Sequence, residues 1–228
     1  MPLTTRRHLL ATGLVGTAAL ALPRRVFAQA SAASPRDRRV LEIAQAEIAR
    51  AGEVLWRRDI AAIADFGVHS AERRFHFADM ENGTVRSFHV THGRGSDPEH
   101  DGWLNGYSNI EGSLMTSRGA YISWEWYKGR YGTSIRMGGL DPSNSNALPR
   151  AIVMHPAQYA TQAHLAQWGR LGRSDGCFAM APEDFREALW HLSGGRLLFA
   201  DTLGLSADGT RLPPSMPPGD APLPGTGL

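Results

Sequence analysis

The sequence is poor in cysteine, in net charge and in metal-binding motifs, and each of these absences excludes a class of structure or function. Cys177 is the only cysteine among 228 residues, so the chain cannot form an internal disulfide. The formal charge is only +2; residues 1–30 contribute four arginines and no acidic residue, which leaves −2 for the rest. This near-neutral balance argues against nucleic acid as a partner. Nine histidines occur without an HExxH motif or a tight Cys/His cluster, so we predict no metal and no cofactor.

The first thirty residues have the features of an export signal. The run Thr4–Leu10 fits the twin-arginine pattern, and a mildly apolar run, Leu9–Leu22, follows it. Ala28-Gln29-Ala30 fits the small-x-small rule for cleavage. The apolar run is too short for a membrane span, although an uncleaved N-terminal anchor is the alternative. We predict twin-arginine export, cleavage after Ala30, and a periplasmic mature protein with no stable membrane span.

The remaining chain divides into three predicted parts: a helical segment over 31–59, a catalytic domain over 60–203 and a Pro/Gly-rich tail over 204–228. Ser34 and Pro35 predict the start of a helix and Gly52 predicts its end. This helix is expected to pack against the domain without a catalytic role. The tail is too rich in proline for helix or sheet, and is either disordered or a rigid extended segment across the surface.

Short strand-like segments separated by Gly and Asn turns predict a mainly β domain with a few flanking helices, an α+β arrangement. Asn82-Gly83 predicts a hairpin with a type I′ turn. Helices are predicted over Pro156–Trp168 and from Pro182 to Gly194-Gly195. The predicted strands cover 60–66, 73–80, 85–91, 120–127, 133–137, 151–155 and 196–202.

The single cysteine lies in the polar, glycine-rich stretch Gly169–Met180. A lone cysteine is usually a small buried apolar residue. Here the preceding residues, Arg173–Gly176, are too polar for a core position. We therefore interpret Cys177 as a reactive thiol on a loop.

A strand-like run that ends in His155 lies upstream of the cysteine. A thiol beside an imidazole is the arrangement that a cysteine nucleophile needs, because the thiolate is the reactive form. His155 is the candidate base. The amides of Gly176 and Cys177 are candidates for an oxyanion hole. Arg173 is expected to favour the thiolate, and Asp175 to oppose it.

The run Ser174-Asp175-Gly176-Cys177, with a strand-borne His155 upstream, resembles the catalytic motif of L,D-transpeptidases, where a histidine is followed by Ser/Thr-His-Gly-Cys. The closer resemblance is to the murein L,D-transpeptidase catalytic domain branch of these YkuD-like cysteine enzymes. It spans roughly Ile60 to Asp201. Further stretches carry it in the same order: His92–Ser96, Tyr107–Asn109 with Gly112-Ser113, Gly119 with Tyr121, Ala151–His155 and Gly169–Ser174.

The resemblance implies an L,D-transpeptidase-like β-sandwich or barrel and a thiol-dependent transferase of peptidoglycan synthesis, and hence of cell-wall biogenesis and cell shape. It implies that Cys177 attacks a carbonyl at an L-to-D junction of a stem peptide, with His155 as base and the Pro156 carbonyl orienting the ring. An amine on a neighbouring stem captures the thioester and forms a 3-3 or 1-3 cross-link. The partners are donor and acceptor muropeptides, with the glycan chain as a further candidate.

Substrate contacts are expected from Ser174, Arg173, Asp175, Tyr121 and His92. Core packing of Tyr121 and a hydrogen-bonded loop position for His92 are the alternatives. Asp175 stands where the wider family has histidine, which affects the expected contacts to the acyl donor. Two other functions stay open: a cysteine L,D-peptidase that uses water as acceptor, and a catalytically silent peptidoglycan-binding module. The cross-link type and the oligomeric state are not determined by the sequence.

Overall fold

The computed structural model describes residues 33–206, 208 and 210 of the chain. By its internal contacts the chain divides into Met1–Ala32 and Ala33–Leu228, and only the second unit has a described structure. The predicted export signal over 1–30 and most of the predicted tail over 204–228 lie outside the described residues. Within the described part, no helix combines the length and the apolar character that crossing a membrane requires.

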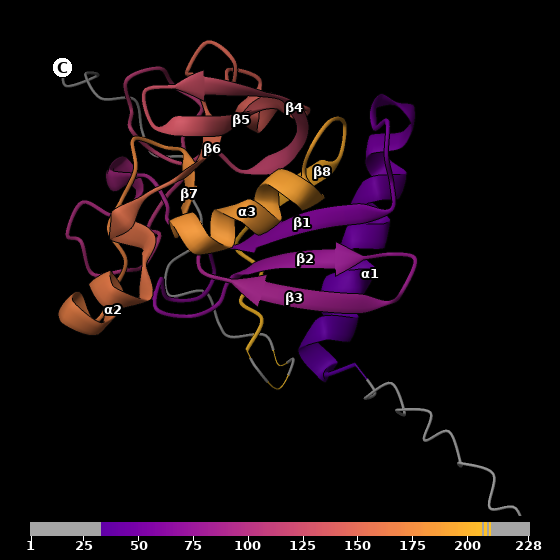
Figure 1. The fold of residues 1–228 in the computed structure, drawn as a ribbon, viewed down its shortest axis with the longest axis horizontal. Coiled ribbons are helices and arrows are strands. Elements are labelled where there is room, and N and C mark those ends of the chain that lie inside the picture. The colour runs from indigo at the N-terminus through magenta and orange to yellow at the C-terminus, as the bar shows by residue number, and fades with distance from the viewer. Residues whose placement is uncertain (1–32, 207, 209, 211–228) are drawn as a thin grey trace, which may run out of the picture. The chain divides into compact units, whose positions relative to one another are not determined.

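Eight strands form one sheet in the order β3-β2-β1-β8-β4-β5-β6-β7 (Figure 1). β1 is parallel to β8 and β6 is parallel to β7, whereas the other neighbours are antiparallel. The predicted mainly β class is confirmed, because in residues 33–206 this half-barrel sheet is accompanied by three α-helices. The strands are β1 Ile60–Asp65, β2 Phe75–Asp79, β3 Thr84–Phe88, β4 Gly119–Gly129, β5 Gly132–Gly139, β6 Val153–Pro156, β7 Phe178–Met180 and β8 Leu197–Asp201.

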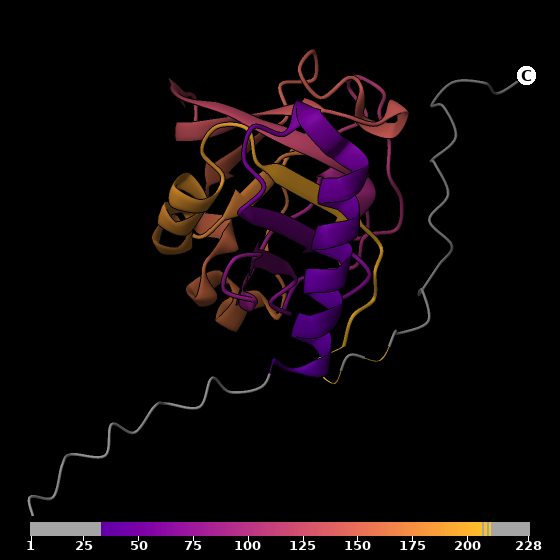
Figure 2. The same cartoon turned by 90° about the vertical axis from the view of Figure 1, so that its right-hand side faces the viewer.

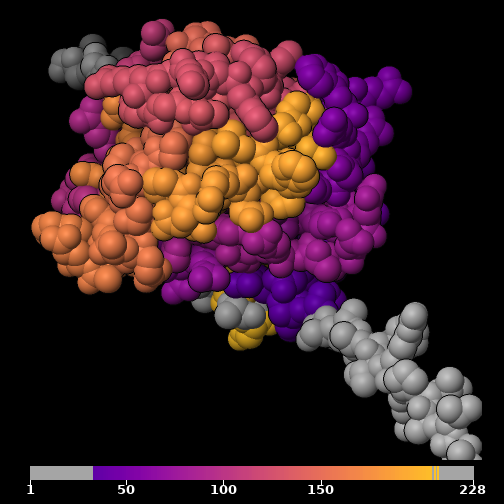
Figure 3. Space-filling model, viewed as in Figure 1, coloured from indigo at the N-terminus to yellow at the C-terminus, as the bar shows by residue number. Residues whose placement is uncertain are grey.

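The helices α1 (Pro35–Ala51) and α3 (Pro182–His191) cover opposite faces of the sheet (Figures 1 and 2). α1 has the predicted ends: the Ser34 hydroxyl accepts the Asp37 N–H, and Gly52 follows the last helical residue. In the space-filling view, α3 covers the middle of one face and the short helix α2 (Gln162–Trp168) projects at the lower left (Figure 3).

β2 and β3 form the predicted hairpin, but the expected type I′ turn is wrong. The loop has four residues, Met80 to Gly83, and among them Gly83 alone has a positive φ, of 63°. A type I′ turn needs positive φ at both central residues. The Asp79 carboxylate accepts the N–H groups of Glu81 and Asn82, and these bonds stabilise the longer loop instead.

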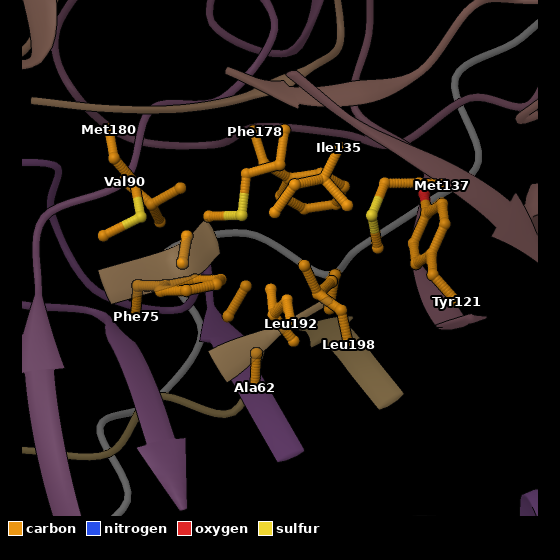
Figure 4. Close-up of a cluster of buried hydrophobic side chains, with 14 of the residues drawn as sticks. Ala62, Phe75, Val90, Tyr121, Ile135, Met137, Phe178, Met180, Leu192 and Leu198 are labelled. Carbon is orange, nitrogen blue, oxygen red and sulfur yellow. The ribbon is translucent and has the colours of Figure 1, made fainter. Parts of the chain in front are cut away.

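The central strands β1 and β8 are buried on both faces. Because side chains alternate along a strand, Ala61 and Ile63 pack with Val40 and Ala44 of α1, whereas Ala62 and Ala64 point into the other core. That second core lies between the sheet and α3 and is shown in Figure 4. Its larger members include Phe66, Phe75, Tyr121, Met137, Phe178, Phe185 and Leu192.

The predicted helix over Pro156–Trp168 is only partly correct. Pro156 completes β6, a 3-10 turn covers Gln158–Ala160, and α2 begins at Gln162 after the Thr161 N-cap. α3 begins at Pro182 as predicted, yet it ends at His191, before Gly194. The last predicted strand is confirmed as β8.

A buried carboxylate ties the end of β8 to β1. The side chain of Asp65 accepts N–H groups from Gly67, Leu203, Gly204 and Leu205 at 2.7–2.9 Å. Leu205 packs in the core under α1. The chain just beyond β8 is therefore held against the domain as far as Leu205.

Candidate functional site

The parallel pair β6 and β7 brings the predicted thiol and base together. Met154 is paired with Phe178, and both side chains are fully buried in the core beside α3. Strand alternation then places His155, which follows Met154, and Cys177, which precedes Phe178, on the opposite side of this pair. A short parallel pairing therefore places on one side of the sheet two residues that are 22 positions apart in sequence.

The ring of His155 has a defined orientation and tautomer. Its Nδ1 lies 3.1 Å from the carbonyl oxygen of Pro156. A carbonyl only accepts hydrogen bonds, so Nδ1 carries the proton and Nε2 has a free lone pair. Burial lowers the pKa of His155, and the bond to Pro156 opposes this effect only in part. The imidazole is thus neutral near pH 7, which is the state that a general base requires.

The thiol of Cys177 is almost buried, with 7% of the residue exposed. Its Sγ donates to the Ala151 carbonyl at 3.7 Å, and within the described part of the chain no hydrogen bond joins it to His155. Burial raises the pKa of Cys177 to about 11, and the charge of Asp175 adds to this; a bond from the Val153 amide and the charge of Arg150 oppose it. The resting thiol is therefore protonated and needs a base.

Ser174 shapes the turn that leads to the cysteine. Its hydroxyl donates to the Cys177 carbonyl at 2.6 Å and accepts the Gly176 N–H at 3.2 Å. Gly176 has φ +111°, and a Cβ there would lie 2.7 Å from the Met115 carbonyl oxygen. Only glycine fits this position without strain. The predicted oxyanion role of the Gly176 amide competes with its bond to Ser174.

His92 lies beneath this turn and is not a cleft residue. It is 1% exposed, its Nδ1 is 2.8 Å from an Nη of Arg74, and its Nε2 is 3.1 Å from a carboxylate oxygen of Asp97. Arginine only donates, so Nδ1 is the acceptor and Nε2 carries the proton. Burial lowers the pKa of His92 to about 4. The predicted substrate contact is wrong; instead, the His92 carbonyl accepts the Ser174 N–H at 2.9 Å.

The family model of the L,D-transpeptidase catalytic domain matches residues 36–200 of the chain. The chain belongs to this family. No curated protein is significantly similar to it.

Solved structures to which the chain is similar include two mycobacterial L,D-transpeptidases and a protein of Bdellovibrio bacteriovorus. One is an L,D-transpeptidase from Mycobacterium smegmatis, with 13% identity and a TM-score of 0.40, covering 63% of this chain and 58% of that one. Another is an L,D-transpeptidase from Mycobacterium tuberculosis H37Rv, with 15% identity and a TM-score of 0.41, covering 63% and 57%. The protein Bd1075 of Bdellovibrio bacteriovorus has 10% identity and a TM-score of 0.40, and the match covers 63% of this chain and 48% of that one. The chain thus spans about half to three-fifths of these structures.

Three further residues predicted to contact substrate in this L,D-transpeptidase domain have different surroundings. Tyr121 is fully buried and its hydroxyl is bonded to Ser117, so the predicted substrate contact is wrong. The Arg173 guanidinium donates to the carbonyls of Asp97 and Pro98, and its effect on the thiolate stays a prediction. Asp175 is exposed and forms a 2.8 Å ion pair with Arg94. Of the three, Asp175, which is exposed, and Arg173, which is partly buried, remain candidates for substrate contact.

Two residues around the thiol and base were not singled out by the sequence. Tyr131, in the turn between β4 and β5, stacks on His155. Arg150 packs against Gly176, and its positive charge acts to lower the pKa of Cys177. Neither belongs to a motif, and the sequence carries no signal that would have identified them. The strand β7, directly after Cys177, was also missed because it has only three residues.

The described residues do not suggest a resident metal. Across 33–206, 208 and 210, no group of three or more His, Cys, Asp or Glu side chains is arranged to hold a metal ion. The buried cluster of His92, Asp97 and Arg74 is occupied by its own hydrogen bonds.

Proposed function

We propose that this protein is an exported cysteine L,D-transpeptidase that cross-links peptidoglycan stems, with Cys177 as nucleophile and His155 as general base. The observation that carries the proposal is the placement of both side chains on one side of the β6–β7 pair, with the His155 Nδ1–H held by the Pro156 carbonyl. That bond leaves Nε2 to take the thiol proton. Membership of the L,D-transpeptidase family supplies the substrate class.

In the acylation half, His155 Nε2 accepts the proton of the Cys177 thiol as Sγ attacks the carbonyl carbon at an L-to-D junction of the donor stem. The tetrahedral intermediate collapses, and the C–N bond breaks. The amine of the departing D-residue takes the proton from His155, which returns to its neutral form. A thioester between Cys177 and the shortened stem remains.

In the second half, the side-chain amine of a diamino acid on a neighbouring stem attacks the thioester. His155 accepts a proton from the amine and returns it to the sulfur, so a new amide forms and the thiol is restored. A stem has L-to-D junctions after its first and its third residue. Use of the first gives 1-3 cross-links, and use of the third gives 3-3 cross-links. Water in place of the amine would make the protein a peptidase.

Export is part of the same proposal, because peptidoglycan lies outside the cytoplasmic membrane. The run around Arg6 and Arg7 supports the twin-arginine route, and cleavage after Ala30 would release the periplasmic protein. Replacing Arg6 and Arg7 by lysine should leave uncleaved precursor in the cytoplasm. Export of this double variant at the wild-type rate would contradict the assigned route.

The test of the activity is mass spectrometry of defined muropeptides incubated with residues 31–228, beside a folded Cys177→Ala control. Cross-linked dimers that disappear with Cys177→Ala are the expected result, and their fragment masses identify the donor junction. Shortened monomers without dimers would move the assignment to a peptidase. Absence of any Cys177-dependent product from folded protein would favour a silent peptidoglycan-binding module.

A further inference from the structure

Arg150 is a half-buried cation whose neighbours are all neutral. One Nη donates to the Ser108 carbonyl at 2.7 Å and to the Ser117 hydroxyl at 3.3 Å. The other donates to the Ser113 hydroxyl at 3.4 Å and to the Met115 carbonyl. Across the described residues, no carboxylate lies within ion-pair distance of it. Four acceptors thus fix the guanidinium, but none neutralises its charge.

This fixed charge faces the cysteine turn. A Cβ on Gly176 would lie 3.1 Å from an Nη of Arg150, so the guanidinium packs directly against the residue before Cys177. The next residue after Arg150 is Ala151, whose carbonyl accepts the Cys177 thiol. Two adjacent residues therefore lie close to the cysteine: Arg150 places its guanidinium against Gly176, and Ala151 accepts the thiol hydrogen bond with its carbonyl.

The backbone around this contact adopts an uncommon conformation. Ala151 has φ +54° and Leu114 has φ +58°, and these are two of the three non-glycine residues with positive φ in the described chain. Gly176 also has positive φ. Left-handed backbone at non-glycine residues carries strain, and such strain clusters at functional sites. The three segments that meet around Cys177 are thus held in shapes that local preference does not favour.

We propose that Arg150 is a positioning residue that supplies the fixed positive charge opposite the Cys177 thiolate. The inference rests on the proposed function, because it concerns the same thiol. A preorganised charge at the place where negative charge develops lowers the barrier to forming it, since no group has to reorient during the reaction. Arginine suits this role because it stays protonated even when burial lowers its pKa, as it does here.

The other ionisable groups near the thiol do not supply this charge. Asp175 opposes the thiolate, but it is exposed and paired with Arg94. Burial raises the pKa values of Tyr121 and Tyr159, so both are neutral near pH 7. His155 becomes positive only after it has taken the thiol proton. Within the described part of the chain, Arg150 is therefore a cation that acts on Cys177 before the proton moves, and it packs against the residue before the cysteine.

The test uses the single cysteine as its own probe. The rate of Cys177 alkylation by iodoacetamide is measured against pH for the purified wild-type protein and for Arg150→Met, Arg150→Gln and Arg150→Lys. Arg136→Met is the matched control, because its exposed guanidinium pairs with Glu125 and removing it changes the net charge equally. In the Met and Gln variants, the midpoint of the plot of alkylation rate against pH should rise by about one pH unit, and alkylation at pH 7 should be about tenfold slower.

The Lys variant should recover most of the wild-type midpoint because it keeps the charge, and Arg136→Met should not move it. A wild-type midpoint in a folded Met or Gln variant would overturn the proposal and leave Arg150 with a purely structural role. A shift in the Lys variant as large as in the Gln variant would also overturn it; this comparison decides if the Met variant does not fold. Alkylation requires no stem peptide, so the two proposals can fail separately. The protein can fail to cross-link muropeptides while Arg150 still shifts the pH dependence of alkylation, and it can cross-link them while Arg150 has no such effect.

Discussion

The ring of Tyr131 stacks on the imidazole of His155, with centroids 4.3 Å apart and planes inclined by 18°. Tyr131 lies in the turn between β4 and β5 and is 41% exposed, whereas His155 is 1% exposed. The tyrosine therefore covers one face of the proposed base. This contact contributes to the burial that lowers the pKa of His155.

Replacing Tyr131 by alanine should shift the acid limb of the pH–rate profile for cross-link formation to higher pH. Solvent would reach the imidazole, its pKa would rise toward the ordinary value, and the base would lose its free lone pair at a higher pH. Tyr131→Phe, which keeps the stack, is the control. An acid limb shared by the alanine variant and the wild type would show that the stack does not tune the base.

Alanine at position 176 should disrupt the cysteine turn. The backbone has φ +111° and the new Cβ would lie 2.7 Å from the Met115 carbonyl oxygen, so the variant should lose about 2–3 kcal/mol of unfolding free energy and most alkylation of Cys177. Gly169→Ala is the control, because it also has positive φ but open space around it. It should lose about 1 kcal/mol and keep the thiol reactive. Both effects are measured by denaturant unfolding and alkylation rate.

The buried His92 should make the protein less stable in mild acid. Its pKa is lowered to about 4 in the folded state, whereas an unfolded histidine titrates near 6.5. The unfolded chain therefore binds more protons between these values, and stability present above pH 6.5 falls as the pH drops toward 4. Measured by urea unfolding, the loss of unfolding free energy between pH 7 and pH 4 should be smaller in His92→Gln than in the wild type by up to about 3 kcal/mol. An unchanged slope would contradict the neutral state assigned to His92.

Asp65→Asn should destabilise the fold strongly. The carboxylate accepts four backbone N–H groups, and an asparagine would place an NH2 group against at least one of them. The expected loss in unfolding free energy is about 2–4 kcal/mol. Asp201→Asn, at a carboxylate that accepts one N–H from Thr202, is the control and should lose less than about 1 kcal/mol. Equal losses in the two variants would mean that the link from β1 to 203–205 is not stabilising.

Local sequence patterns were sufficient for the features that depend on neighbouring residues. The ends of α1 followed from Ser34, Pro35 and Gly52 because caps act within one helical turn. Most strands followed from their alternation and turns, whereas the three-residue β7 was missed. The prediction of a type I′ turn was wrong because the Asp79 carboxylate, which lies outside the Asn-Gly pair, stabilises a four-residue loop.

The one thiol and the upstream histidine at the end of a strand could be read from the chain alone, since motif and periodicity are properties of neighbouring residues. Which charged residues surround them depends on how distant segments of the chain pack together. Arg173 is four positions from Cys177 yet donates to the 97–98 carbonyls, whereas Arg150 is distant in sequence and lies against the cysteine turn. Likewise, the sequence could not decide between a substrate contact and a hydrogen-bonded loop position for His92, because its burial and its bonds to Arg74 and Asp97 arise from long-range packing that no local pattern encodes.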